Sequence, residues 1–149
     1  MSIFRALDIS ASALTANRYR MDVIGENIAN ADTTRTATGG PYRRKYVIFQ
    51  ERSQPFSSLL QSARGALNTT NSAGGGVKVI DTREDESPFK LVYDPEHPDA
   101  DADGYVSLPN VDMEREMVDM IAASRAYEAN ITVINNFKTT ANQALQIGR

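Results

Sequence analysis

Apolar side chains recur every seven positions in the C-terminal segment, residues 109–149. Two rows result: Met113, Met120, Tyr127, Ile134 and Ala141 form one, and Met117, Ile131 and Leu145 form its companion. The only proline of this segment is Pro109, and its only glycine is Gly148. The pattern predicts an amphipathic helix with coiled-coil character, capped by Asn110 or Asp112. At about 1.5 Å per residue it would be roughly 50 Å long, so it needs a long partner.

A second helix is predicted at the N-terminus, where the same spacing appears. One row holds Leu7, Leu14, Met21 and Ile28, and the companion row holds Ile3 and Ile24, with Ser10 and Asn17 as polar breaks. Long, narrow helices are marginal on their own, because their stability comes from burying the apolar face. We therefore expect the two helices to pack antiparallel or nearly so within one chain, and also against other copies. In dilute solution residues 1–30 and 111–149 should be largely disordered.

Between the helices the pattern changes to that of strands. β-Branched and aromatic residues, or apolar and polar residues in alternation, predict strands at 42–49, 77–81, 89–93 and 105–108. The polar run TREDES, residues 82–87, predicts a turn that pairs the second of these strands with the third. A short helical turn at 54–63 and a flexible loop near 64–76 are also expected.

These patterns together predict an α+β fold with long N- and C-terminal helices that pair as a coiled-coil-like bundle. Residues 1–32 and 109–149 would form a discontinuous helical assembly domain. Residues 33–108 would form a small β-rich module inserted between its two parts, with a thin core because the apolar content of this stretch is modest.

Composition and charge narrow the possible functions. The 149 residues carry a net charge of -3, which argues against a nucleic-acid-binding surface, and contain no cysteine, so no disulfide is expected. After Glu128 the only charged side chains are Lys138 and Arg149. The remaining Asn, Thr and Gln side chains can hydrogen-bond other protein without burying charge, which indicates a surface that other chains cover. We expect neither a cleavable secretory signal nor a membrane span.

Candidate chemistry is sparse. Asp99, Asp101, Asp103 and Gly104 match the start of a calcium-binding loop, but its twelfth position is Asn110 instead of glutamate, so a connecting loop is the better interpretation. The single histidine, His97, has no serine or cysteine nucleophile nearby to form a triad, and one histidine leaves a metal site short of ligands. The basic run 43–45 is interpreted as a solvated strand edge or a protein contact. The sequence therefore predicts no enzyme, no metal site and no cofactor.

Several segments carry a family resemblance. The stretch ASALTANRYRMDVIGENIANADTT, residues 11–34, resembles the N-terminal signature of flagellar basal-body rod and hook proteins. The stretch RAYEANITVI, residues 125–134, resembles the C-terminal motif of the same family. Within that family, PYRRKYVIFQ (41–50) and DPEHPDADADGYVSLPNVD (94–112) are similar to the protein of the proximal rod. The resemblance covers essentially the whole chain and is least characteristic between residues 63 and 76.

The resemblance implies a function as a structural subunit of the proximal rod of the bacterial flagellar basal body. Such a subunit would assemble into a helical tube that transmits torque and surrounds the export channel, within the periplasmic rod. Its implied partners are the rod proteins FlgB, FlgF and FlgG, the rod-base component FliE, copies of itself and, in transit, the type III export apparatus. Two alternatives stay open at this point: a soluble helical adaptor or chaperone and, more distantly, a calcium sensor.

From the helical rows and the signature motifs we predict a set of residues at subunit interfaces. They are Leu7, Leu14, Met21, Ile24, Asn27, Ile28, Asn30, Met113, Met117, Met120, Tyr127, Asn130, Ile131, Ile134 and Leu145.

Overall fold

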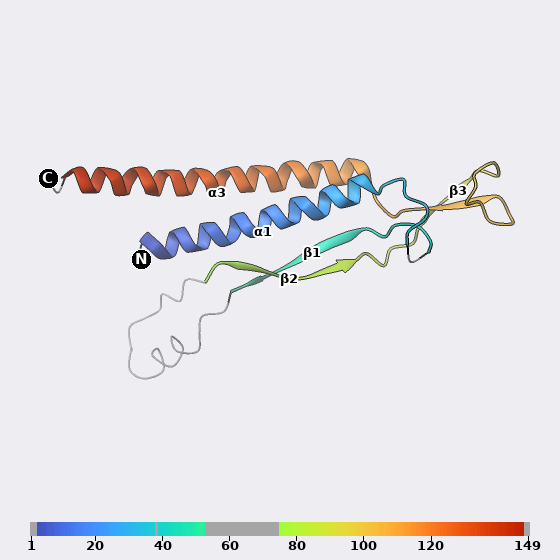
Figure 1. Cartoon of the computed structure of the whole chain (residues 1–149), viewed down its shortest axis with the longest axis horizontal. Coiled ribbons are helices and arrows are strands. Elements are labelled where there is room, and N and C mark those ends of the chain that lie inside the picture. The colour runs from blue at the N-terminus through green and yellow to red at the C-terminus, as the bar shows by residue number, and fades with distance from the viewer. Residues whose placement is uncertain (1–2, 38, 53–74, 148–149) are drawn as a thin grey trace, which may run out of the picture.

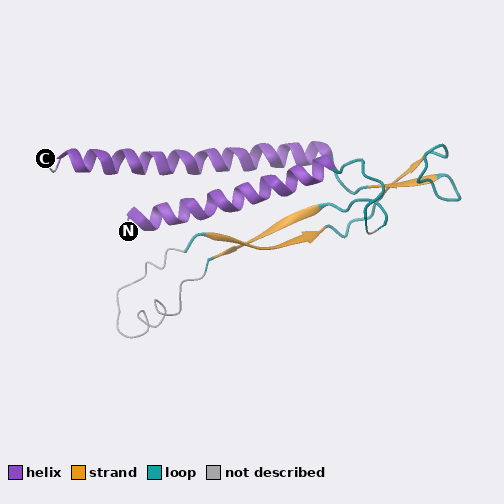
Figure 2. Ribbon diagram, viewed as in Figure 1, coloured by secondary structure: helices purple, strands orange, loops and turns teal. Residues whose placement is uncertain are grey.

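The computed structural model describes residues 3–37, 39–52 and 75–147 of the chain. Along the sequence, its elements are helix α1 (Ile3–Ala29), strands β1 (Lys45–Glu51), β2 (Val77–Glu84), β3 (Lys90–Tyr93) and β4 (Tyr105–Leu108), and helix α3 (Met113–Ile147). Along the sequence, the strands of the short antiparallel sheets lie between two long terminal helices. The α+β prediction is therefore confirmed (Figure 2).

The elements stack with α1 in the middle. Helix α1 contacts α3 on one side and the β1–β2 ribbon on the other, and the two helices run antiparallel, as expected (Figure 1). Side chains of α1 hold the ribbon in place: the amide of Val77 donates to Ser12 Oγ at 3.1 Å, and the hydroxyls of Tyr19 and Thr82 are 3.0 Å apart. Helix α3, in contrast, contacts only α1 among the described helices and strands.

The described part of the chain forms two sheets, each of two antiparallel strands. β1 pairs with β2 from Lys45 opposite Glu84 to Glu51 opposite Val77, and a bulge lies between Ile48 and Phe49. β3 pairs with β4 from Lys90 opposite Leu108 to Tyr93 opposite Tyr105.

The predicted pairing of 77–81 with 89–93 is therefore wrong. The polar residues Thr82, Arg83 and Glu84 do not turn but continue β2 opposite the start of β1. The amide of Asp85 then donates to the carbonyl of Arg44 at 2.7 Å. In a ribbon with one solvated face, charged side chains are compatible with a strand, and their polarity alone does not indicate a turn.

The ends of the helices are fixed by local hydrogen bonds. Asp112 caps α3, since its Oδ1 accepts from the amides of Glu114 at 3.1 Å and Arg115 at 3.4 Å. Asn110, the other predicted cap, makes different contacts, which are described below. At the end of α1, Asn30 Nδ2 donates to the carbonyl of Glu26 at 2.9 Å and so ties the last turn together.

The predicted helical turn at 54–63 lies outside the described residues, and so does most of the loop near 64–76. Two glycines of that loop are described and lie at the open end of the ribbon. The amide of Arg52 donates to the Gly76 carbonyl at 2.8 Å, and the Gly75 amide donates to the Arg52 carbonyl at 3.3 Å. Gly76 has a φ of 95°, and a Cβ there would meet Ser12 Oγ at 2.3 Å, so the ribbon can approach α1 only with glycine here.

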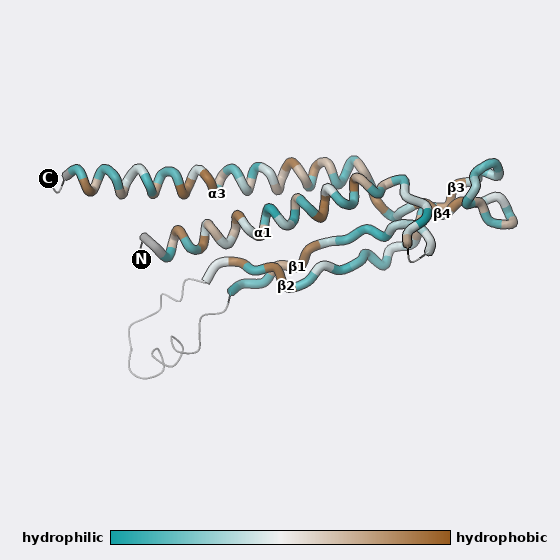
Figure 3. Tube along the Cα trace, in the orientation of Figure 1, coloured by the Kyte–Doolittle hydropathy of each residue, from teal (hydrophilic) through white to brown (hydrophobic). Residues whose placement is uncertain are grey.

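Among the described residues buried apolar side chains are few, and they come from both helices, from β4 and from the segments just before β1 and α3. They are Ala16, Val23, Ile24, Tyr42, Val106, Val111 and Ala123. Apolar positions recur along both helices without forming a continuous apolar stretch (Figure 3). None of the described helices is long and apolar enough to cross a membrane.

Candidate functional site

Asn27, in the last turn of α1, is the centre of a buried polar cluster. Its Nδ2 donates to the Lys45 carbonyl at 2.8 Å and to Glu116 Oε2 at 3.0 Å. Its Oδ1 accepts from the Lys45 amide at 2.9 Å and from the Tyr42 hydroxyl at 3.0 Å. All four hydrogen-bonding positions of the amide are thus used. One side chain joins the end of α1 to the start of β1 and to α3.

Glu116 is the charged member of this cluster, and its side chain is fully shielded from solvent. A buried carboxylate is costly unless it is paired and hydrogen-bonded. Arg44 supplies the pair: its Nε donates to Glu116 Oε1 at 2.6 Å, and its guanidinium also lies 3.6 Å from Asp85 and 3.8 Å from Asp119. Carboxylates from α3 and from the segment after β2 therefore converge on one guanidinium.

Asn110, just before α3, links the segment that precedes β1 to the segment that follows β2. Its Oδ1 accepts from the Arg44 amide at 2.8 Å, and its Nδ2 donates to the carbonyls of Asp85 at 2.9 Å and Ser87 at 3.2 Å. It therefore holds the segment that follows β2 against the start of β1. We refer to Asn27, Tyr42, Arg44, Asn110 and Glu116 together as the junction.

Burial and nearby charge keep Tyr42 and Arg44 in the protonation states that these hydrogen bonds require. Burial raises the pKa of Tyr42 to about 12, and nearby carboxylates add to the shift, so the phenol remains a donor. Burial alone would lower the pKa of Arg44, but the hydrogen bond to Glu116 and the surrounding negative charge outweigh it and raise that pKa. Hydrogen bonds from Ser87 lower the pKa of Asp85.

The junction is suited to holding elements together. Among the described residues no buried side-chain nitrogen or oxygen lacks a hydrogen-bond partner, and no group of three or more His, Asp or Glu side chains could hold a metal ion.

In the 99–104 loop, Asp101 Oδ1 accepts from the amides of Asp103 at 3.0 Å and Tyr105 at 2.8 Å. That carboxylate therefore shapes the turn before β4.

Comparison with known proteins identifies the family. A model described as "Flagella basal body rod protein" matches residues 7–35, and one described as "Flagellar basal body rod FlgEFG protein C-terminal" matches residues 102–147. The flagellar basal-body rod protein FlgC of Bacillus subtilis is 50% identical over 153 residues, with 100% of both chains covered. The chain belongs to the FlgC family of flagellar basal-body rod proteins.

Other relatives agree. The FlgC protein of Borreliella burgdorferi is 48% identical, covering 99% of this chain and 98% of the relative, and that of Escherichia coli O6:H1 is 42% identical over 100% of both. The resemblance inferred from the motifs is confirmed. The family is structural and non-enzymatic, so the prediction that this chain is not an enzyme is also confirmed, and the adaptor and calcium-sensor alternatives lose their support.

The family signature falls on the junction. In the N-terminal motif, Asn27 makes its four contacts to β1 and α3, whereas Asn30 bonds within its own helix end and accepts from Thr33 Oγ1 at 3.2 Å. In the C-terminal motif, Asn130 Nδ2 donates to the Ala126 carbonyl at 2.7 Å, inside α3. Asn27 therefore joins separate elements, whereas Asn30 and Asn130 each donate to the carbonyl four residues earlier.

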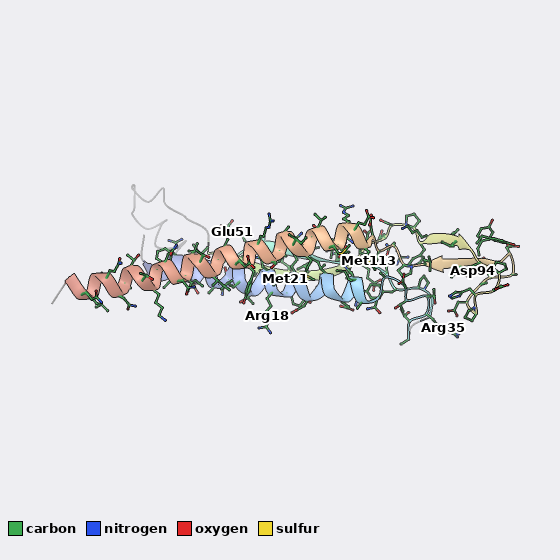
Figure 4. The ribbon with its side chains drawn as sticks, turned by 90° about the horizontal axis from the view of Figure 1, so that it is seen from above. Arg18, Met21, Arg35, Glu51, Asp94 and Met113 are labelled. Carbon is green, nitrogen blue, oxygen red and sulfur yellow. The ribbon has the colours of Figure 1, made fainter. Side chains whose placement is uncertain are left out.

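The other predicted interface residues divide into two sets. Those that lie buried or half-buried within the chain are Leu7, Leu14, Met21, Ile24, Ile28, Met120, Tyr127 and Ile134. Those on α3 that stay exposed are Met113, Met117, Ile131 and Leu145. Figure 4, which labels Met21 and Met113, shows Met113 at the start of α3. Of the two apolar rows of α3, the companion row thus lies largely outside the contact with α1.

Apolar spacing missed several residues that the structure places between the elements. Glu116 and Ala123 are buried and Phe137 is half-buried, and with Asn130, which was predicted from the C-terminal motif, they recur at seven-residue spacing. The row was overlooked because it contains a charge and an amide. Ser10, interpreted as a polar break, is buried as well. A search that admitted small and polar residues at the same period would have found this row.

Proposed function

We propose that this chain is a subunit of the proximal rod, which assembles with copies of itself and with the rod proteins FlgB, FlgF and FlgG and the rod-base component FliE. The assembly is a helical tube that surrounds the export channel and transmits torque. Membership in a family of structural rod proteins gives the class of function. The observation that carries the assembly proposal is the bare apolar surface of α3.

This surface is extensive for so small a chain. Besides the exposed members of the predicted interface, α3 exposes Val118, Ile121 and Val133. Contiguous exposed apolar side chains on a protein surface mark sites of interaction. Because α1 covers only one side of α3, the rest of the helix is available to neighbouring subunits. A chain that offers apolar surface in several directions favours repeated heterologous contacts, as a tube requires.

The junction supports the division into residues 1–32 with 109–149 as an assembly domain and 33–108 as an inserted module. A subunit transmits torque only if its parts do not swing freely against each other. The buried hydrogen bonds of Asn27 and the ion pair of Arg44 with Glu116 fix the start of β1 on both helices. The module is thereby attached rigidly at its base.

Export through the type III apparatus is compatible with the composition. A chain that passes through a narrow channel must be unfolded, and a disulfide would obstruct this passage. The absence of cysteine from the sequence fits such a route.

Deletion and resupply of the gene in its flagellated host test the rod assignment. The deletion strain should lack motility and complete rods, the resupplied gene should restore both, and purified basal bodies should contain the chain. Ile134→Asp places a charge in the half-buried seam between α1 and α3, where charge is costly, so flagella should be lost. Ile134→Leu, which keeps an apolar side chain, is the matched control. Normal flagella with the aspartate would show that the seam is misassigned.

A further inference from the structure

The β3–β4 hairpin has a bare apolar face. Residues directly opposite each other on paired strands lie on the same face, so Leu91 opposite Ser107 and Tyr93 opposite Tyr105 share one face. Leu91 is 67% exposed, Tyr93 64% and Tyr105 44%. Val106, on the opposite face, is 2% exposed. Val92, which pairs with Val106, is 44% exposed, so that face is covered only in part, and Leu91 and Tyr93 on the other face are the most exposed apolar side chains of the hairpin.

Nothing else in the described chain packs on this hairpin as an element. β3 and β4 contact only each other among the described helices and strands, and Figure 1 shows the hairpin projecting beyond the helix pair, away from both termini. The rings of Tyr93 and Tyr105 pack edge to face with centroids 5.3 Å apart, which holds the aromatic surface in a fixed shape. An isolated two-stranded hairpin is marginally stable in water, so a partner on this face would stabilise it.

A second bare surface lies on the N-terminal half of α3. Met117, Val118 and Ile121 are 48%, 66% and 55% exposed, and their spacing of three and four residues places them side by side on the helix. Arg125 follows Ile121 by one turn and is also exposed. In one chain the hairpin face and this α3 stripe do not meet, because the described α3 contacts neither β3 nor β4.

We propose that the face formed by Leu91, Tyr93 and Tyr105 docks on the stripe Met117, Val118 and Ile121 of a second copy of this chain. The proposal rests on the proposed function as a rod subunit and identifies one contact within that assembly. The two surfaces differ, so the contact is heterologous and repeats without closing on itself unless the rotation closes a ring. Such a contact extends an array, in agreement with a rod.

The lengths of the two surfaces agree. From Leu91 to Tyr93 the strand spans about 7 Å at about 3.3 Å per residue. From Met117 to Ile121 the helix rises about 6 Å at about 1.5 Å per residue. Each surface can therefore cover the other without leaving a long apolar remainder.

Charge indicates how the two surfaces meet. The connection from β3 to β4 contains five carboxylates and no lysine or arginine: Asp94, Glu96, Asp99, Asp101 and Asp103. Figure 4 labels Asp94 on this connection, at the far end of the molecule from the chain termini. Arg125 of the second copy fits against Asp94 or Asp103, and its guanidinium also suits the faces of the two tyrosine rings. Glu128, three residues further along α3, would repel the same loop and so limits how far the hairpin can lie along the helix.

Cysteine cross-linking tests the contact, since the natural chain contains no cysteine. Leu91→Cys and Val118→Cys are expressed together as separate single-cysteine chains in the deletion host, and purified basal bodies are treated with a short bis-maleimide. We expect a dimer that contains one chain of each kind, and no dimer when either variant is expressed alone. The matched control replaces Val118→Cys by Ile80→Cys, which is 54% exposed on β2 and should give no dimer with Leu91→Cys. Ser107→Cys, opposite Leu91, provides a second position on the same face.

A charge exchange adds a second measurement. Arg125→Glu in the Val118→Cys chain should abolish the cross-link, and Asp103→Arg in the Leu91→Cys chain should restore it. Failure to form the mixed dimer in basal bodies that contain both variants would overturn the contact and leave the rod assignment intact. Cross-linking of Leu91→Cys to itself or to a different rod protein would overturn the choice of a second copy through α3. If the chain were missing from basal bodies, the proposed function itself would fail.

Discussion

The two ends of the helix pair are built in different ways. At the junction end, Asn27 and Glu116 are buried and hydrogen-bonded, and Ile24 and Ala123 are buried as well. At the other end, every described residue of α3 from 138 to 146 is exposed. There Thr139 and Thr140 turn their hydroxyls to carbonyls of their own helix.

This difference shows which part of the helix pair a single chain stabilises and which part depends on neighbouring chains. The junction fixes the relative positions of α1, α3 and β1 through hydrogen bonds that exist within a single copy. α3 has 35 residues and α1 has 27, and Figure 1 shows α3 extending past the start of α1. The far end of α3 therefore gains burial only from neighbours, which agrees with a subunit whose helices are completed by assembly.

Removal of Glu116 should have the largest effect on the junction. Glu116→Ala leaves Arg44 without its closest carboxylate and removes one of the bonds of Asn27, so unfolding should become easier by about 3 kcal/mol. Urea unfolding of the purified chain measures this. Glu128→Ala, an exposed carboxylate on the same helix, should change stability by less than about 0.5 kcal/mol. Equal midpoints for the two variants would contradict the importance given to the junction.

The two asparagines of the N-terminal motif, Asn27 and Asn30, should differ in their contribution to the free energy of unfolding. Asn27→Ala removes four hydrogen bonds and leaves the Tyr42 hydroxyl and the Lys45 backbone without partners, at a cost of about 2 kcal/mol or more. Asn30→Ala removes bonds that water can replace, at a cost of about 1 kcal/mol. Unfolding curves of both variants under the same conditions decide the order. A larger loss for Asn30→Ala would mean that the signature acts mainly by ending the helix.

Hydrogen exchange can locate the boundary between the two ends. The sequence alone predicts that residues 1–30 and 111–149 are largely disordered in the dilute monomer, whereas the hydrogen bonds of the junction favour an ordered region around Asn27 and Glu116. Amides near Ile24 and Ala123 should exchange more slowly than those of residues 130–147. In assembled rods the far end should become protected as well. Strong, uniform protection along both helices of the monomer would show that the far end needs no neighbours.

Seven-residue spacing was sufficient to predict the helices and their antiparallel contact, because long amphipathic segments of this kind have few alternatives. The strands at 77–81, 89–93 and 105–108 were also located within a few residues. Their pairing was not, because residues 82–87 are polar in either a turn or a solvated strand. Which of the two forms depends on β1, more than thirty residues earlier in the sequence.

The junction was not predicted, and the reason is physical. Arg44 and Glu116 are 72 residues apart, and no local pattern pairs them. Glu116 also occupies a helical position that faces α1, where a search for apolar rows passes over a charge. The motif around Asn27 indicated the family but gave no contact, since the amide bonds groups from β1 and α3 that only the fold brings together.

The smallest effect expected is a pH dependence confined to the junction. The pKa of Tyr42 is raised from about 10 to about 12 in the folded chain, mainly by burial. The folded state thus holds this proton more tightly, so the contribution of Tyr42 is complete below pH 10 and is lost as the pH rises toward 12. Ionisation would turn the hydroxyl that donates to Asn27 Oδ1 into a second acceptor facing it.

Tyr42→Phe isolates this contribution. At neutral pH the variant should be about 1 kcal/mol less stable than the natural chain, because it lacks the hydrogen bond to Asn27. Between pH 10 and pH 12 the difference in unfolding free energy should shrink and then reverse. In this range the unfolded natural chain ionises Tyr42 more readily than the folded chain does, and the phenylalanine variant has no such group. Unfolding free energies of both proteins at several pH values give the difference directly, and effects common to both cancel. Tyr127→Phe, in the seam between the helices, controls for the loss of one phenol outside the junction. A difference between the natural chain and Tyr42→Phe that stayed constant up to pH 12 would mean that the Tyr42 hydroxyl is open to water, and the junction would then be looser than its hydrogen bonds indicate.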